Sequence, residues 1–315
     1  MEEQYRVGVS VATLWTSPQT PRACDQNVLT SPVDIRGWLK ELSQTERRQL
    51  SDDDLIQTQV LYGEKVVVLD KQTDWLKVAV TEQPSSKHEA GYPGWLPASH
   101  VIAESQLKAY HRDRKFAVIN QPTAFVYTDD GERTLEVSYQ TTFPLIDSPD
   151  KEKELRVLTP HGLRVINKQD AVIYSDLASI PQPHGTDLVK SGEMFLDLPY
   201  LWGGISGFGF DCSGFTYTLH KAWGIVIPRD ASEQALQGVS IAQTDCQPGD
   251  LIFFAKDKGR GPVYHVGIYY GEGHMLHAPS SGKSIEIVAI EETVHRDNFY
   301  TIKRFYSDTK CGESE

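Results

Sequence analysis

Apolar and polar residues alternate in two neighbouring stretches near the N-terminus, residues 59–68 and 75–80. Alternation with a period of two places the apolar side chains on one face of a β-strand. A shorter β pattern comes earlier, at residues 6–15, and residues 32–50 instead have helical spacing with many charges. We therefore predict a small β domain at residues 4–104 with a helical insertion between its strands.

A second, weaker β pattern extends from Phe116 to Tyr174 and predicts another small β domain at residues 105–178. A proline-containing linker follows at residues 180–185. The spacing from Leu188 to Leu196 then predicts a helix that begins a third domain, which we place at residues 186–306.

The third domain contains a glycine-rich, aromatic stretch, residues 200–215, that leads to a single cysteine. Apolar residues at helical spacing follow from Phe215 to Trp223, so Cys212 is expected near the start of a helix. Free N–H groups at a helix start favour a thiolate over a thiol. A free cysteine is otherwise a small buried apolar residue, but this position predicts a nucleophile with a lowered pKa.

Two histidines downstream lie in a stretch with the composition of a β-hairpin, residues 265–278. A three-residue loop at Gly271–Gly273 would place His265 opposite position 279, so that His277 is its diagonal neighbour on the same face. A cysteine, a base on a facing strand and a second imidazole that orients the base form a triad. We predict Cys212, His265 and His277 as the catalytic residues.

These segments together resemble the NlpC-type cysteine peptidases of bacterial cell-wall metabolism. The resemblance rests on the Asp-Cys-Ser-Gly sequence at residues 211–214, the Pro-Gly-Asp strand entry at 248–250 and the His-Val-Gly-Ile strand at 265–268. The first β domain, with Gly-Trp-Leu-Pro at 94–97, resembles a bacterial SH3-like barrel, and the second is similar. The implied fold is multidomain: two SH3-like β-barrels followed by a papain-like α+β catalytic domain.

Within that family, the chain resembles the γ-D-glutamyl-L-diamino acid endopeptidases of the YkfC type over nearly its whole length. That resemblance implies that Glu64, Tyr92 and Asp230 meet at the cleft and bind the ammonium of an N-terminal L-alanine. It also implies that Ser213, beside Asp211 at the helix start, holds the D-glutamyl carboxylate of the substrate. The sequence departs from the pattern after Asp230, where Ala231 stands in place of a hydroxyl residue.

Net charge excludes several classes of partner. A formal charge of −12 argues against nucleic acid or an anionic membrane surface as the main partner. The first residues lack a positive segment followed by an apolar one, and the four cysteines, at positions 24, 212, 246 and 311, have no disulfide-framework spacing. We therefore expect a cytoplasmic protein.

A zinc site is the alternative chemistry for four residues of the third domain, namely Cys212, Cys246, His265 and His277. Their spacing matches no structural zinc motif, so neither a metal nor another cofactor is expected.

The expected function is hydrolysis of the bond between γ-D-glutamate and L-lysine or meso-diaminopimelate in short murein peptides that begin with L-alanine. Cys212 would attack, His265 would move the proton, and the Cys212 N–H with the Tyr92 hydroxyl would stabilise the oxyanion. Two alternatives remain open from the sequence. One is a wall- or peptide-binding module with an inert third domain, and the other is acyl or amide transfer on the same scaffold.

Overall fold

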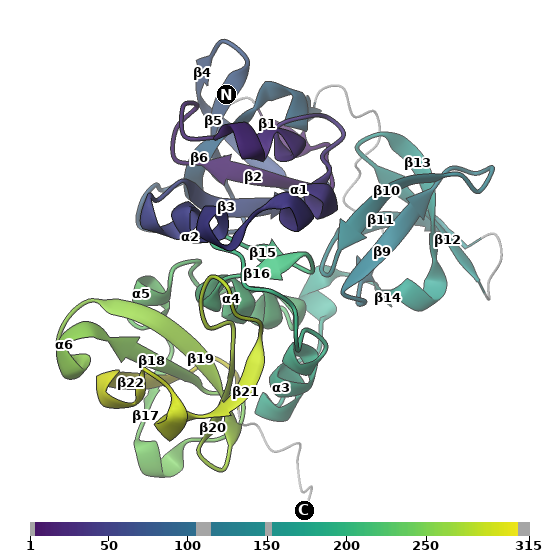
Figure 1. Ribbon diagram of the computed structural model, residues 1–315. Coiled ribbons are helices and arrows are strands. Elements are labelled where there is room, and N and C mark those ends of the chain that lie inside the picture. The colour runs from purple at the N-terminus through teal and green to yellow at the C-terminus, as the bar shows by residue number, and fades with distance from the viewer. Residues whose placement is uncertain (1–3, 105–114, 149–152, 308–315) are drawn as a thin grey trace, which may run out of the picture.

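The computed structural model describes residues 4–104, 115–148 and 153–307, and Figure 1 shows them as three domains. The two β domains lie side by side, and the catalytic domain lies beneath the first of them. The short hairpin β15–β16 (Ile205–Ser206 and Gly209–Phe210) lies where the domains meet. Cys311 lies outside the described residues.

The first domain is an antiparallel sheet with the strand order β3-β2-β6-β5-β4-β1-β7. Its strands are β1 (Gln4–Val7), β2 (Val11–Trp15), β3 (Ile56–Leu61), β4 (Lys65–Gln72), β5 (Trp75–Val80), β6 (Tyr92–Pro97) and β7 (Val101–Ala103). Alternating side chains such as Val78 and Val80 enter one core together with Leu14 and Leu96. The period-two pattern in the sequence thus corresponds to the buried face of the sheet.

The helical insertion between β2 and β3 forms two helices, α1 (Ile35–Glu41) and α2 (Gln44–Asp52). The sequence pattern predicted one helical segment, but Ser43 interrupts it as the N-cap of α2. Its hydroxyl accepts from the Glu46 N–H, and its own N–H donates to the Glu46 carboxylate at 2.8 Å. This capping box begins a new helix and turns the chain.

The second domain repeats the arrangement on a smaller scale, with the strand order β10-β9-β13-β12-β11-β8-β14. Its strands are β8 (Phe116–Ile119), β9 (Thr123–Tyr127), β10 (Arg133–Ser138), β11 (Thr142–Asp147), β12 (Glu154–Thr159), β13 (Gly162–Asn167) and β14 (Ala171–Tyr174). Tyr62 of the first domain packs into this second core. Its hydroxyl also hydrogen-bonds His161 at 2.8 Å, so the two β domains share a contact.

The third domain packs helices against a six-stranded sheet with the order β17-β22-β18-β19-β20-β21. Its helices are α3 (Gly185–Glu193), α4 (Cys212–Ala222), α5 (Ala231–Gln234) and α6 (Lys256–Gly259). Its sheet strands are β17 (Val239–Ile241), β18 (Leu251–Ala255), β19 (Val263–Gly271), β20 (His274–His277), β21 (Glu286–Ala289) and β22 (Phe299–Arg304). The first helix begins earlier than the sequence predicted, because the Asp187 carboxylate caps it by accepting from the His184 N–H.

One hydrophobic cluster extends from the insertion of the first domain into the catalytic domain. Trp38 and Leu50 from the insertion belong to it, and so do Phe210 and Phe215 from the catalytic domain. Burying apolar surface on both sides fixes the first domain against the catalytic one. No helix among the described residues is long and apolar enough to cross a membrane.

Candidate active site

Cys212 is the first residue of α4, as the sequence predicted, and Asp211 is the N-cap. The Asp211 carboxylate accepts from the Gly214 N–H at 2.6 Å, which satisfies one of the free donors of the first turn. Position 214 has no room for a side chain, because a Cβ there would lie 2.0 Å from the Gly204 carbonyl oxygen. The glycines therefore allow the approach loop to pack directly against the helix start.

The charge state of Cys212 differs from the prediction. Its side chain is buried, and burial, with a smaller contribution from the nearby Asp211 carboxylate, raises the pKa of the thiol to about 12. Hydrogen bonds from the backbone N–H groups of Val266 and Ser213 act in the opposite direction but are the smaller effect. The helix start alone predicted a thiolate, whereas desolvation in the folded protein favours the neutral thiol.

His265 and His277 lie on the neighbouring strands β19 and β20. The predicted register is confirmed, since Ile268 pairs with Leu276 and Tyr269 with Met275. The turn is tighter than predicted: β19 continues to Gly271, β20 begins at His274, and the register shifts after Tyr269. The two imidazoles share a hydrogen bond of 2.8 Å between His265 Nε2 and His277 Nδ1.

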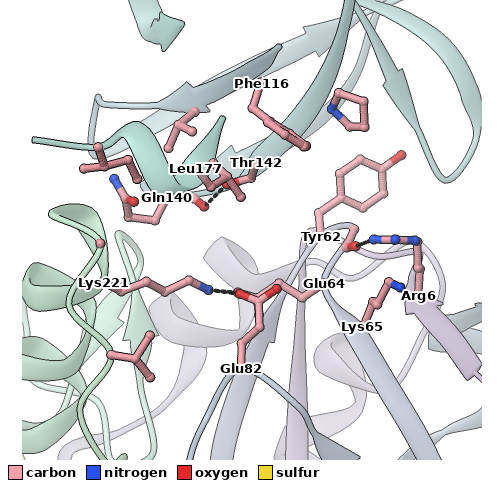
Figure 2. A pocket seen from close by; sticks show the side chains of 16 residues that line it. Arg6, Tyr62, Glu64, Lys65, Glu82, Phe116, Gln140, Thr142, Leu177 and Lys221 are labelled. Atoms are coloured by element: carbon pink, nitrogen blue, oxygen red, sulfur yellow. Dashed lines mark hydrogen bonds and ion pairs between the residues drawn. The ribbon is translucent and has the colours of Figure 1, made fainter. Parts of the chain in front are cut away.

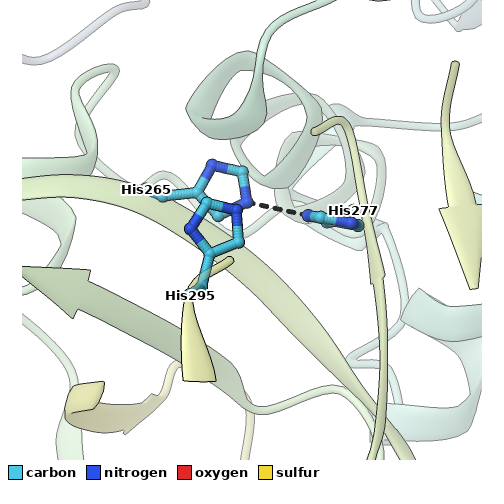
Figure 3. Close-up of side chains that lie close together, drawn as sticks. All are labelled: His265, His277 and His295. Carbon is cyan, nitrogen blue, oxygen red and sulfur yellow. Dashed lines mark hydrogen bonds between the residues drawn. The ribbon is translucent and has the colours of Figure 1, made fainter. Parts of the chain in front are cut away.

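A third histidine, His295, stacks on His265 with ring centroids 4.1 Å apart and planes only 8° from parallel. Figure 3 shows this stack, with His277 meeting it edge-on. His295 Nδ1 hydrogen-bonds the Tyr264 hydroxyl at 2.9 Å, which fixes the plane of the stack. No sequence pattern indicated His295, because it lies in a loop without periodicity and reaches the site only through folding.

Burial determines the charge of all three imidazoles. Together with a smaller effect of a neighbouring imidazole or of Lys283, it lowers the pKa of His265 well below 6.5, that of His277 to about 3 and that of His295 to about 4. All three rings are therefore neutral at pH 7.

The same three histidines offer nitrogen atoms within 4.8 Å of one another, a spacing that a metal ion could use. Their orientation does not suit one. The rings of His265 and His295 are nearly parallel, so their lone pairs lie in two separate planes and do not converge on one point, and His265 Nε2 is already hydrogen-bonded to His277 Nδ1. The arrangement fits a proton relay better than a zinc centre.

Cys212 and His265 line one cavity of about 460 Å³ between the catalytic domain and helix α2 of the first domain. The sequence did not predict most of its lining. The other residues that line it are Arg48, Ser51, Asp52, Tyr200, Trp202, Tyr264, Pro279, Ser280, Ser281 and His295. Burial, together with the nearby Cys212 and Asp211, raises the pKa of Tyr200 well above 10, so its hydroxyl remains a hydrogen-bond donor.

Both neighbours of the nucleophile bind a buried arginine, Arg229, which no motif in the sequence indicated. Its guanidinium donates to the two Asp211 carboxylate oxygens at 2.6 and 3.1 Å and to the Ser213 hydroxyl at 2.9 Å. A third donor reaches the Thr58 hydroxyl of the first domain at 3.0 Å. Arg229 therefore places a fixed positive charge beside the predicted carboxylate-binding serine.

Tyr92 and Asp230 meet, as the resemblance implied. The Tyr92 hydroxyl donates to the two Asp230 oxygens at 3.0 and 3.1 Å, so this tyrosine is not directed at an oxyanion. Lys87 Nζ also lies 3.0 Å from Asp230 and donates to Gln57 Oε1 at 3.3 Å. Gln57 and Lys87 of the first domain are thus members of this group that the sequence did not reveal.

Glu64 does not join that group. It lies in the turn between β3 and β4, where its carboxylate accepts from the Leu61 N–H at 2.9 Å and pairs with Lys221. Figure 2 shows this pair in a second cavity, of about 380 Å³, together with Glu82. Lys221 is in the last turn of α4, about 13 Å along the helix axis from Cys212. The turn that follows β3 places Glu64 at the wrong end of α4 for the predicted contact.

Comparison with known proteins agrees with this geometry. The NlpC/P60 family matches residues 197–304, the YKFC SH3b2 domain matches residues 119–174, and the bacterial dipeptidyl-peptidase Sh3 domain matches residues 47–101. A protein of Bacillus subtilis named gamma-D-glutamyl-L-lysine dipeptidyl-peptidase is 43% identical, over 95% of this chain and 98% of its own length. A Bacillus cereus protein of the same name is 41% identical, over 95% of this chain and 90% of its own length.

A solved structure has the same three-domain arrangement. The crystal structure of an NlpC/P60 family protein from Bacillus cereus superposes with a TM-score of 0.92 at 40% sequence identity, covering 96% of this chain and all 100% of that one. The site geometry and the sequence identity lead to the same conclusion. The geometry is a buried cysteine at a helix start with a histidine relay on adjacent strands, and the identity to the relatives extends along nearly the whole chain. The chain belongs to the NlpC/P60 family of cysteine peptidases and has two SH3-like domains before its catalytic domain.

Proposed function

We propose that this protein hydrolyses the bond between γ-D-glutamate and L-lysine or meso-diaminopimelate in short peptides with a free N-terminal L-alanine, releasing L-Ala-D-Glu. The observation that carries the proposal is the cavity shared by Cys212 and His265, with His277 hydrogen-bonded behind His265. The names of the two Bacillus relatives support both the bond and the release of a dipeptide.

The proposed chemistry begins from a neutral thiol and a neutral imidazole. Because His277 occupies His265 Nε2, His265 Nδ1 is the nitrogen available to take the Cys212 proton as sulfur attacks the γ-carbonyl carbon. The tetrahedral intermediate collapses to a thioester when the leaving amine receives that proton from His265. Water then attacks the thioester carbonyl and gives a proton to His265. The C–S bond breaks, L-Ala-D-Glu leaves as the free acid, and His265 returns the proton to the Cys212 sulfur.

The hydrogen bond between His265 and His277 determines the tautomer of each ring in the resting site. His265 must carry its proton on Nε2 and donate it to His277 Nδ1, which leaves the His277 proton on Nε2. His277 Nε2 itself lies 3.5 Å from a Glu286 carboxylate oxygen. When His265 becomes positively charged during attack, this chain of acceptors stabilises the imidazolium.

We assign oxyanion stabilisation to the Cys212 N–H and the Tyr200 hydroxyl. Tyr200 lines the same cavity as Cys212, and its raised pKa keeps its proton available for donation. Tyr92 was the sequence-based candidate, but its hydroxyl is engaged with Asp230.

We assign the acyl side of the substrate to the groups around Arg229. The D-glutamyl carboxylate would lie near Ser213, where the Arg229 guanidinium supplies positive charge. The N-terminal ammonium would lie at Asp230, the residue that follows Arg229, with Tyr92 beside it. Asp211 then has a positioning role, since its oxygens are taken by Arg229 and the Gly214 N–H.

The test is incubation with L-Ala-γ-D-Glu-L-Lys and with its diaminopimelate counterpart, followed by mass spectrometry. We expect L-Ala-D-Glu and the free diamino acid, at least about tenfold slower hydrolysis of the N-acetylated peptide, and no turnover by Cys212→Ala. A product containing a new amide would instead support acyl transfer. Binding of the peptide without cleavage would support the peptide-binding alternative.

We further propose that the substrate comes from murein turnover and is cleaved in the cytoplasm. Short peptides with a free L-alanine amine are what remains when larger wall fragments lose their sugars, and a free buried thiol is compatible with a reducing compartment. Cell fractionation with an antibody against the chain tests this placement. Recovery of the protein outside the cytoplasmic fraction would contradict it.

A further inference from the structure

A lysine of this chain already occupies a site built for an ammonium group. Lys87 Nζ lies 3.0 Å from an Asp230 carboxylate oxygen and donates to the Tyr92 hydroxyl and to Gln57 Oε1. It also lies 4.2 Å from the centroid of the Tyr92 ring. A carboxylate, two neutral oxygen acceptors and an aromatic face are together the surroundings that a primary ammonium prefers.

The backbone next to Lys87 is fixed against the catalytic domain. The Ser86 N–H donates to the Glu233 carboxylate of α5 at 2.9 Å, and the Ser86 hydroxyl donates to the same oxygen at 2.5 Å. Two residues earlier, the Pro84 carbonyl accepts from the Arg229 N–H at 3.2 Å. The loop that contains Lys87 is therefore fixed by hydrogen bonds to the catalytic domain. Only the four-carbon side chain of Lys87 has to move for the site to open.

Exposure indicates that this movement is feasible. The Lys87 side chain is 40% exposed and that of Asp230 is 28% exposed, so solvent reaches the pair on one side. An ion pair that is open to water contributes little to stability, and a long flexible lysine gains side-chain entropy on release. The occupied and open arrangements are thus expected to be close in free energy.

We propose that Lys87 is an internal competitor for the ammonium-binding site, and that the N-terminal amine of a substrate binds there by displacing Lys87 Nζ into solvent. This inference rests on the proposed function, which places the substrate amine at Asp230. Displacement exchanges one ammonium for another on the same acceptors. A peptide without a charged amine gains nothing from the Asp230 carboxylate, so its binding does not depend on whether Lys87 occupies these acceptors.

Competition of this kind raises the apparent dissociation constant in inverse proportion to the fraction of molecules in which the site is open. If Lys87 occupies the site about nine-tenths of the time, removing its charge strengthens binding of the free amine about tenfold. Chemistry at Cys212 is unaffected, because Lys87 does not line the cavity that holds the nucleophile.

The experiment measures KM and kcat for L-Ala-γ-D-Glu-L-Lys and for its N-acetyl form with the wild type and with Lys87→Met. Methionine keeps most of the length of the side chain and removes the ammonium. We expect KM for the free amine to fall about tenfold with kcat within about twofold, and KM for the acetylated peptide to change little. Lys87→Ala should reproduce the result, and Lys40→Met, at an exposed lysine of α1, should leave both constants unchanged.

Three results would overturn the inference. An unchanged KM in Lys87→Met would mean that Lys87 does not compete, and a raised KM would mean that Lys87 itself binds substrate. An equal improvement for free and acetylated peptides would mean that Lys87 obstructs the cleft sterically rather than competing as a cation. Failure of the wild type to cleave either peptide is a separate outcome, because it refutes the proposed function rather than the role of Lys87.

Discussion

At the scale of single residues, the resting nucleophile and its base are both uncharged. Burial raises the pKa of Cys212 to about 12 and lowers the pKa of His265 well below 6.5, so the thiolate–imidazolium pair is disfavoured in this desolvated pocket. The proton must therefore pass to His265 as the sulfur attacks, when the carbonyl oxygen begins to carry the negative charge. A neutral resting pair also protects the thiol from adventitious oxidants.

This charge state predicts how Cys212 reacts with iodoacetamide. Only the thiolate is alkylated, and its fraction rises tenfold per pH unit well below the pKa, so the rate should increase steadily between pH 5 and pH 9. Labelling is followed by mass spectrometry of the peptide that contains Cys212. A rate already constant from about pH 5 upwards would show a preformed ion pair and contradict the neutral assignment. The Cys246 peptide is an internal comparison, since burial raises the pKa of that thiol to about 12 as well.

At the scale of secondary-structure elements, α2 changes the function that the SH3-like domain can have. This helix belongs to the insertion, not to the barrel, and it contributes Arg48, Ser51 and Asp52 to the catalytic cavity. Arg48 and Asp52 are four positions apart, so they lie on one face of the helix. Within the described part of the chain, Arg48 has no carboxylate partner, which leaves its charge available to a ligand.

We predict that Arg48 contacts the carboxylate of the leaving diamino acid. Arg48→Ala should raise KM for L-Ala-γ-D-Glu-L-Lys about tenfold, because a charge-assisted hydrogen bond is lost. The measurement compares this peptide with its C-terminal amide. The wild type should prefer the free acid, and the variant should treat the two alike. Asp53→Asn, an exposed change just after α2, serves as the control. Persistence of the preference in Arg48→Ala would contradict the assignment.

At the scale of the whole molecule, buried histidines determine how the fold responds to acid. Burial lowers the pKa of His100, His220 and His295 to about 4 and that of His277 to about 3. In the unfolded chain these groups take up protons near pH 6.5. Because their folded pKa values are depressed, the unfolded state binds more protons between about pH 4 and pH 6.5, and stability falls as the pH drops through that window.

The melting temperature should therefore decrease as the pH is lowered from 7 to 4.5. His100 is fully buried in the first domain and reaches the Thr30 carbonyl at 2.9 Å, so His100→Gln keeps a donor and removes one titrating group. A pKa shift from 6.5 to about 4 corresponds to roughly 3 kcal/mol at acid pH, so the variant should lose less stability than the wild type over the same range. Calorimetry at several pH values measures the difference. An identical decrease in both proteins would show that His100 titrates normally.

The sequence by itself determined what depends on neighbours along the chain. Helical spacing after residue 212 placed Cys212 at a helix start, and strand periodicity with a short turn set the register that brings His265 next to His277. Strand patterns predicted the two small β domains, whereas the SH3-like and papain-like fold class came from the family resemblance of short motifs. These features are local, because backbone geometry repeats with a fixed period and side chains at known separations must share a face.

Only the tertiary structure decided which surfaces meet and how much water remains between them. Burial reversed the predicted pKa shift of Cys212, and domain packing directed Glu64 to Lys221 instead of the substrate site. The same packing brought α2 over the cavity and Lys87 onto Asp230. Desolvation and contacts between distant segments depend on the sum of all packing interactions, and no pattern along the chain encodes them at a single position.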